Sequence, residues 1–251
     1  MTPVITREMA ERCVEVMSHG LVSGIGVPEP GKMCVEAAIS FALGLPHGDD
    51  PKCVTQSLRR LKIRLNDSAW SSNQARAEGL RRLALAQLGS AGVLDEKEFI
   101  RRVVEMTIRK AVPVGLRAVA SRNPTHAKDL EAAAVRCEQE GTRESARNGE
   151  RVARAAYAAA DAAYAAAAAD AYAAAAADAY AAYAAAAAAA YAAYAAAAAD
   201  AAAAAAAYAA AAADARTRDR VLAEYAEWVV QILIDMQAPG CQWLYLTPKA
   251  A

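Results

Sequence analysis

Residues 155–200 read AAYAAADAAY AAAAADAYAA AAADAYAAYA AAAAAAYAAY AAAAAD, and the same composition continues to residue 215. Over 155–215 the chain holds 48 alanines, eight tyrosines and five aspartates. Alanine is the best helix former because it loses no side-chain entropy in a helix. No glycine or proline occurs between Gly149 and Pro239. Since no other part of the chain alternates polar and apolar residues as strands do, the sequence predicts an all-α protein.

The tyrosines of this segment follow an eleven-residue period. Tyr172, Tyr183 and Tyr194 are eleven residues apart, as are Tyr180 and Tyr191. An eleven-residue repeat keeps one face of a nearly straight helix aligned. We therefore expect these five side chains to form one face, which is the candidate interaction surface. As a single rod, residues 155–215 would be about 90 Å long at 1.5 Å per residue, and the alternative is a folded-back bundle of alanine helices.

Hydrophobic residues other than alanine and tyrosine lie almost entirely outside this segment. Glycines and prolines divide residues 1–141 into about six to seven short helices, which form an N-terminal helical domain. Residues 142–238 are expected to be the long Ala/Tyr/Asp-rich helix, and residues 239–251 an aromatic tail that docks on the core.

Some helix boundaries follow from single residues. Asp50 and Pro51 are expected to start a helix, with Asp50 as the cap and Pro51 at the first position. The sequence KCVTQSLRRLKIRL (residues 52–65) is expected to turn its basic side chains outward. The inward side chains are expected to be Val54, Leu58, Leu61 and either Ile63 or Leu65. Pro113 is expected to end the helix that begins after Asp95.

Charge and composition argue against two classes of partner. The chain has 28 basic and 28 acidic residues, which argues against a protein held on nucleic acid mainly by phosphate neutralisation. Residues 179–199 are uncharged, but they are only alanine and tyrosine, whereas leucine, isoleucine, phenylalanine and valine drive membrane insertion. The five cysteines show no paired spacing, and no charged and then apolar leader follows Met1, which indicates a reducing, cytoplasmic location.

Residues 26–33, GVPEPGKM, resemble the phosphate loop of P-loop nucleotide hydrolases. That chemistry needs backbone N–H groups around the phosphates and a Ser or Thr hydroxyl on Mg²⁺. Here Met33 replaces the hydroxyl, and Pro28 and Pro30 each remove an N–H. A rigid helix–helix connection is the better interpretation.

One loop concentrates possible metal ligands or nucleophiles. The weak candidates for a metal site are His47, Asp49 and Cys53, but a structural zinc site needs regular pairs such as Cys-x₂-Cys. A catalytic pair of Cys34 or Cys53 with His47 or His19 is conceivable. We expect a capped turn, with no metal, no cofactor and no catalytic residues.

Two longer segments carry a family resemblance. Residues 31–54 (GKMCVEAAISFALGLPHGDDPKCV) and 64–90 (RLNDSAWSSNQARAEGLRRLALAQLGS) resemble bacterial all-α proteins of unassigned function whose chains also continue into Ala/Tyr/Asp-rich helices. Residues 150–235 are similar in style to all-α immunity proteins of bacterial polymorphic toxin systems. That resemblance implies a cytosolic protein that binds and blocks a cognate toxin without chemistry of its own.

Three hypotheses for function follow. The first is a non-enzymatic protein that binds a partner protein, or associates with itself, through its tyrosine face. The second is ice binding, because the alanine-rich period resembles that of helical antifreeze proteins, although residues 155–215 lack the regularly spaced threonines of that family. The third is an enzyme or metal site in the loop from His47 to Cys53.

Overall fold

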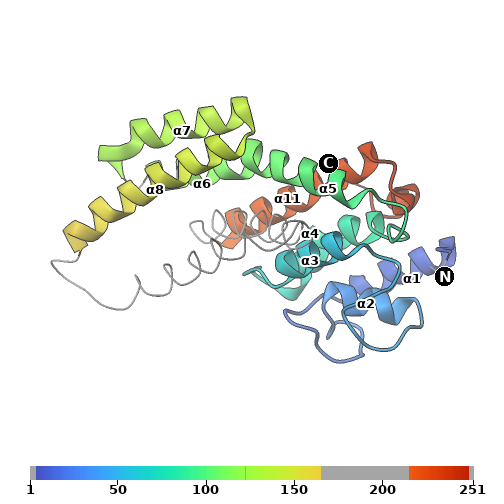
Figure 1. Ribbon diagram of the computed structural model, residues 1–251. Coiled ribbons are helices and arrows are strands. Elements are labelled where there is room, and N and C mark those ends of the chain that lie inside the picture. Colours follow the sequence, from blue (N-terminus) through green and yellow to red (C-terminus); the bar gives the residue numbers. More distant parts are fainter. Residues whose placement is uncertain (1–3, 122, 165–214, 249–251) are drawn as a thin grey trace.

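The computed structural model describes residues 4–121, 123–164 and 215–248, and every regular element in this part of the chain is a helix (Figure 1). The α-helices are α1 (Arg7–Ser18), α2 (Val35–Ala42), α3 (Gln56–Asn66), α4 (Asn73–Ala86), α5 (Glu96–Met106), α6 (Val112–Ala120), α7 (Ala127–Glu140), α8 (Arg143–Tyr164) and α11 (Ala215–Asp235). A π-helical turn, η1 (Thr107–Ala111), and two 3₁₀ segments, η2 (Pro124–His126) and η3 (Pro239–Leu246), complete the order. The all-α prediction is confirmed for these residues.

The number of short helices also agrees with the sequence, since α1 to α7 precede residue 142. Of the expected long helix, residues 142–238, the structure describes the two ends, and each contains a helix: α8 at the start and α11 at the end. Residues 165–214 lie outside the described part of the chain, so the continuous rod and the folded-back bundle both stay predictions.

Several helices begin where a short polar side chain can cap them. The Thr6 hydroxyl accepts a hydrogen bond from the Met9 N–H, and the Asp95 carboxylate accepts from the two N–H groups at the start of α5. In the same way Ser72 caps α4 by accepting from the Ala75 N–H. Each cap accepts a hydrogen bond from an N–H that has no partner inside its own helix. The capping residue thereby determines where the helix begins.

The predicted helix start at Asp50 and Pro51 is wrong. The helix α3 begins five residues later, at Gln56, with Thr55 in the N-cap position. The Asp50 carboxylate has other partners, because it pairs with Lys52 and accepts a hydrogen bond from the Gln56 side chain. Asp50 therefore closes a turn ahead of the helix and does not cap one.

Pro113 does not end its helix, contrary to expectation. The π-helical turn η1 joins α5 to α6, and Pro113 lies in the first turn of α6. In a regular α-helix the proline ring would meet the carbonyl of residue 109, four positions earlier. That residue is part of η1, where the wider turn leaves room for the ring.

The main hydrophobic core lies among α1 to α5, α11 and η3. Helix α11 packs along α4 and also contacts α5 (Figure 1). The largest buried apolar and aromatic side chains of this core are Tyr225, Phe99, Met17, Leu21, Met33, Ile39, Leu58, Leu61, Leu65, Leu80 and Leu83. The Tyr225 hydroxyl has a partner in this apolar setting, since it lies 2.9 Å from the Thr107 hydroxyl in η1.

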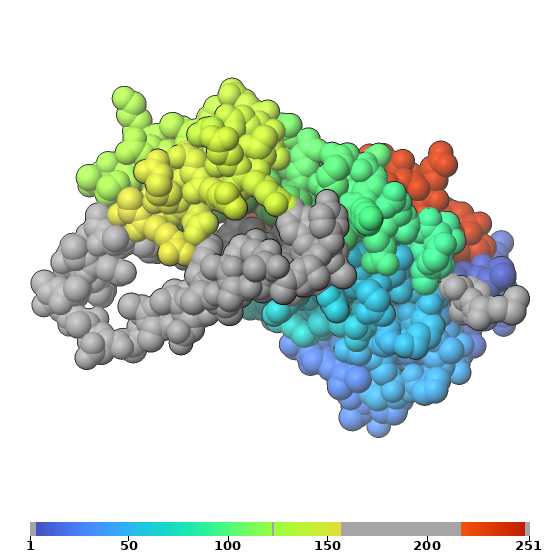
Figure 2. Space-filling model, in the orientation of Figure 1, coloured from blue at the N-terminus to red at the C-terminus, as the bar shows by residue number. Residues whose placement is uncertain are grey.

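A second, smaller core lies among η1, α6, α7 and α8, and Leu116, Leu130 and Cys137 belong to it. Figure 2 shows α6 to α8 in green to yellow, on a different side of the molecule from the blue and cyan helices α1 to α4. Helix α8 thus packs with α6 and α7, and α11 packs with α4 and α5. The second core thus contains residues from both sides of position 141.

One side chain ties η1 to the end of α7. The Arg109 guanidinium donates hydrogen bonds to the carbonyls of Glu138, Gln139 and Glu140, at 2.7–3.0 Å. These are among the last carbonyls of α7, which lack partners within the helix. A positive charge at a helix C-terminus is also favourable to the helix dipole.

The described part of the C-terminal tail, residues 239–248, lies against the core. Its segment η3 packs on α4, and Gly240 approaches so closely that a Cβ there would lie 2.2 Å from the Leu85 carbonyl oxygen. Arg82 on α4 donates to the carbonyls of Leu244 and Thr247 and pairs with Glu227 on α11. Arg82 therefore holds the tail and α11 together.

None of the helices within residues 4–121, 123–164 and 215–248 combines the length and the apolar character that a membrane span requires. The uncharged residues 179–199 are not among these.

Candidate functional site: the hairpin loop between α1 and α2

Residues 22–33 form a short hairpin between α1 and α2, which we call the hairpin loop. Its two sides are joined by hydrogen bonds from the Val22 N–H to the Met33 carbonyl and from the Val27 N–H to the Lys32 carbonyl, both 2.9 Å long. Gly26 and Met33 form an isolated antiparallel bridge. The segment that resembles a phosphate loop is thus a connection between helices, and it uses the Val27 N–H within its own backbone.

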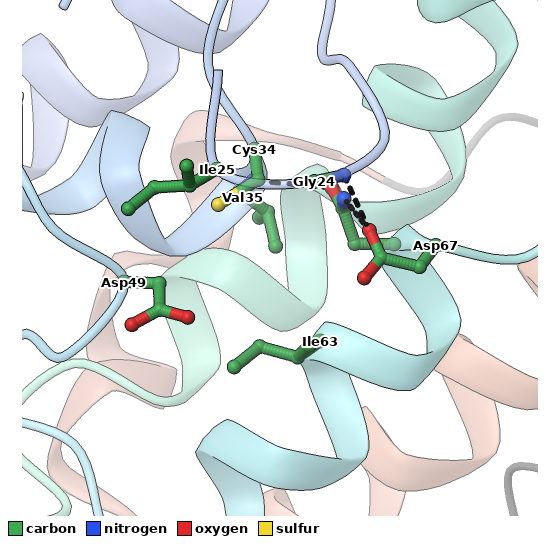
Figure 3. A pocket seen from close by; sticks show the side chains of 8 residues that line it. Gly24, Ile25, Cys34, Val35, Asp49, Ile63 and Asp67 are labelled. Carbon is green, nitrogen blue, oxygen red and sulfur yellow. Dashed lines mark hydrogen bonds between the residues drawn. The ribbon is translucent and has the colours of Figure 1, made fainter. Parts of the chain in front are cut away.

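The end of α3 holds the base of the hairpin loop. The Asn66 side chain donates to the Val22 carbonyl (2.8 Å) and accepts from the Val35 N–H (3.1 Å). The Asp67 carboxylate accepts from the Gly24 N–H at 2.8 Å (Figure 3). Asn66, the last residue of α3, and Asp67, its C-cap, thus bind the first side of the loop and the start of α2.

A buried arginine strengthens this base. The Arg76 guanidinium, on α4, donates to the Leu21 carbonyl (2.8 Å) and to the Asn66 carbonyl (2.7 Å). Burial lowers the pKa of Arg76, and the nearby Asp67 and Asp219 carboxylates oppose that shift. An arginine remains charged in proteins, so both hydrogen bonds are charge-assisted. No pattern in the sequence indicates that Asn66, Asp67 or Arg76 holds this loop.

The tip of the loop is apolar and exposed. Ile25 and Val27 keep 46% and 48% of their surface accessible to solvent. The nearby charges cancel, because Lys32 and Glu29 form an exposed ion pair at 2.7 Å. The loop therefore presents two hydrophobic side chains on a backbone that is already ordered.

A small cavity lies between the hairpin loop, the start of α2 and the end of α3 (Figure 3). Its volume is about 30 Å³, and its lining includes Ile25, Cys34, Asp49 and Ile63. A cavity of this size has room for about one or two water molecules. It is too small for a nucleotide or a sugar.

The structure separates the three weak metal candidates. A ring nitrogen of His47, Nε2, lies 3.2 Å from the Gly26 carbonyl oxygen, and Asp49 pairs with the Arg59 guanidinium at 2.6 Å. Cys53 is fully buried, and this burial raises the pKa of its thiol. In the described part of the chain, no three His, Cys, Asp or Glu side chains are placed to hold a metal ion together. His47 instead contacts the hairpin loop near its tip.

Cys34 occupies the N-cap position of α2, where its sulfur accepts a hydrogen bond from the Ala37 N–H at 3.4 Å. A helix N-terminus favours the thiolate form of such a cysteine. Burial has the larger effect and raises the pKa of the Cys34 thiol. The thiol form is therefore favoured, which does not suit a nucleophile.

The expected interaction residues Tyr172, Tyr180, Tyr183, Tyr191 and Tyr194 lie outside the described residues. Comparison of the chain with protein-family models, with curated proteins and with solved structures gives no match.

Proposed function

We propose that this protein acts by binding another protein and not by catalysis. The observation that carries the proposal is the hairpin loop, which exposes about half of the surface of Ile25 and of Val27 on an ordered backbone. Binding is favoured when the contacting segment is already in its bound conformation, because less entropy is lost on association. Hydrophobic side chains at the centre of an interface then contribute through their removal from water.

The anchoring of the loop supports the same function. Side chains from α3 and α4 hold its base through Asn66, Asp67 and Arg76. Fixed loops on a rigid scaffold are common binding elements in proteins. The partner surface that suits such a loop is a shallow apolar pocket with little net charge, since Glu29 and Lys32 neutralise one another.

The Ala/Tyr segment is the second part of the proposal. We expect one continuous helix from α8 to α11, whose tyrosine face contacts a partner protein or a second copy of the chain. Its support is the eleven-residue period, together with the suitability of tyrosine for interfaces, where it buries a large rigid ring and keeps a polar tip. The resemblance to immunity proteins points to a cytoplasmic protein whose partner is a cognate toxin.

Charged substitutions at the loop tip are expected to weaken partner binding. In the double variant Ile25→Glu and Val27→Glu, two carboxylates would have to lose water on entering an apolar pocket, so the affinity should fall by at least about tenfold, or about 1.4 kcal/mol. The partner to use is the protein encoded by the adjacent gene, and calorimetric titration gives the affinity.

The control places the same charges elsewhere, in the double variant Val93→Glu and Val114→Glu, whose side chains are 67% and 38% exposed. This control should bind as tightly as the unaltered protein. Equal weakening in both double variants would rule out a specific role for the loop. Failure of the unaltered protein to bind the adjacent gene product would contradict the toxin-binding part of the proposal.

Replacing Tyr172, Tyr180, Tyr183, Tyr191 and Tyr194 by alanine is expected to abolish association and leave the helix content high, since alanine is the better helix former. Circular dichroism measures the helix content, and sedimentation velocity measures association of the chain with itself and with the adjacent gene product. The control replaces Asp170, Asp178 and Asp200 by alanine in the same way, because the eleven-residue period places these residues on the opposite face. Unchanged association of the five-tyrosine variant would refute the role of this face.

A further inference from the structure

Three polar side chains from three different helices meet inside the main core. Glu36 on α2 and Lys62 on α3 are both fully buried, and so is Gln87, which caps the end of α4. The Lys62 Nζ lies 3.3 Å from one carboxylate oxygen of Glu36, Oε1. The Gln87 side-chain amide donates to the other oxygen, Oε2, at 3.1 Å. The carboxylate of Glu36 thus lies between an ammonium group and an amide.

These contacts leave several polar atoms of the three side chains without a hydrogen bond. Among the described residues, Lys62 Nζ, Glu36 Oε1 and Gln87 Oε1 are buried without an aligned hydrogen bond, although the first two are close enough to form an ion pair. An ammonium group has three N–H donors, and a carboxylate or amide oxygen can accept more than one hydrogen bond. Buried polar atoms in folded proteins nearly always have a partner, and where no protein group is available the partner is an ordered water.

A fourth unsatisfied atom belongs to the same part of the core. The hydroxyl of Thr55, the N-cap residue of α3, is also buried without a hydrogen bond. The backbone N–H of Thr55 is bonded to the Ser90 hydroxyl, three residues after Gln87. Thr55 and Lys62 are seven residues apart, about two helical turns, so their side chains lie on the same side of α3.

We propose that the core between α2, α3 and α4 is a hydration site, in which at least one ordered water molecule bridges Lys62 Nζ and Gln87 Oε1. A water molecule can accept a hydrogen bond from the ammonium group and donate to the amide oxygen, so it complements both orphaned atoms. A cation would be repelled by Lys62, and an anion would be repelled by Glu36. A neutral donor and acceptor as small as water is the ligand chemistry that the cluster selects, and this role is independent of partner binding.

A crystal structure of the full chain, at a resolution that shows ordered waters, tests the proposal directly. We expect an isolated density peak within hydrogen-bond distance of both Lys62 Nζ and Gln87 Oε1. In the triple variant Glu36→Leu, Lys62→Met and Gln87→Leu the polar atoms are gone, so the peak should be absent. Direct hydrogen bonds from Lys62 and Gln87 to protein groups, with no density between them, would overturn the proposal.

A second measurement keeps the test decisive if the triple variant does not fold. Magnetic relaxation dispersion of water oxygen-17 counts the water molecules that stay inside a protein in solution. The single variant Gln87→Leu keeps the Glu36–Lys62 pair and removes the acceptor of the bridge, so the dispersion amplitude should fall relative to the unaltered protein. An unchanged amplitude would show that no long-lived water depends on Gln87, and would reject the bridge.

Discussion

Lys62→Met is expected to destabilise the protein by about 3–5 kcal/mol at neutral pH, because it leaves a buried carboxylate without its counter-charge. Methionine is unbranched and fills much of the same space, so the loss is mainly electrostatic. Both members of the pair are fully buried, and Lys62 Nζ lies 3.3 Å from Glu36 Oε1. After the substitution, Glu36 keeps the hydrogen bond from Gln87 as its remaining direct support.

The effect should depend on pH, and its sign follows from the pKa of Glu36. Burial raises the pKa of Glu36 from 4.5 to about 7, while the attraction of Lys62, and more weakly of Arg59, opposes the shift. A carboxyl group with a raised pKa in the folded state stabilises the protein at low pH, and this contribution is lost as the pH rises through the folded-state pKa. Removal of Lys62 raises that pKa further.

The stability of Lys62→Met should therefore fall between pH 5 and pH 8, by up to about 1.4 kcal/mol per pH unit. Urea denaturation at several pH values, followed by circular dichroism, measures this slope. Burial also lowers the pKa of Lys62, so the lysine of the unaltered protein contributes a slope of the opposite sign at higher pH. The unaltered protein shares this slope only up to about pH 7, the pKa of its paired Glu36, so the two proteins should diverge most between pH 7 and pH 8.

The control is the double variant Lys62→Met and Glu36→Leu, which removes both charges and should recover most of the lost stability, since apolar replacements of buried ion pairs are often neutral. It should also lose the slope between pH 5 and pH 8. Equal destabilisation of Lys62→Met at pH 5 and pH 8 would contradict an ionised Glu36 in the core.

The Glu36–Lys62 pair also shows a contact that sequence patterns cannot predict. The sequence of α3 predicted that Leu58, Leu61 and either Ile63 or Leu65 face inward. The structure buries Leu58, Leu61 and Leu65 fully. The same pattern predicted that all its basic side chains face outward, which is wrong for Lys62. Helical periodicity gives the direction of a side chain, but the partner that permits burial of a charge is Glu36 on another helix. A pattern within one helix cannot identify it.

For the hairpin loop, too, the local sequence predicted the kind of structure but not the distant residues that hold it. Its glycines and prolines predicted a rigid connection between helices, and the replacement of a hydroxyl by Met33 weighed against a nucleotide site. Its anchors are Asn66 and Asp67, more than 40 positions away from Val22 and Gly24. Such polar residues at a helix end are typical of any helix terminus, so the sequence offered no signal of this contact. Likewise, Pro113 is a normal helix stop, and only the π-helical turn before it allows the helix to continue.

Gly26→Ala is expected to disrupt the hairpin loop and to abolish partner binding. Gly26 has a positive φ of 70°, and a Cβ at this position would lie 1.9 Å from the Lys32 carbonyl oxygen. That oxygen accepts the Val27 N–H hydrogen bond, so the backbone must separate where the two sides of the loop meet. Left-handed strain of about 1–2 kcal/mol and two lost hydrogen bonds of about 1 kcal/mol each give a local cost of about 3–4 kcal/mol.

The matched control is Gly24→Ala, in the same loop. Gly24 also has a φ of 70°, but a Cβ there meets nothing within 4 Å. This variant carries only the backbone strain, so the difference between the two variants isolates the contact with Lys32. Amide hydrogen exchange at Val27 should be faster by roughly 30-fold in Gly26→Ala than in Gly24→Ala, because two hydrogen bonds, about 2 kcal/mol, separate the variants and local opening sets the rate there.

The exchange of α4 amides should change little in either variant, since the loop can open without the core. Loss of binding in Gly26→Ala with an intact core would then show that the ordered shape of the loop is required, and not merely its exposed Ile25 and Val27. Binding that survives in Gly26→Ala, while the loop amides exchange fast, would mean that the partner contacts another surface. Equal exchange in the two variants would show that the close approach of Gly26 to Lys32 does not hold the loop closed.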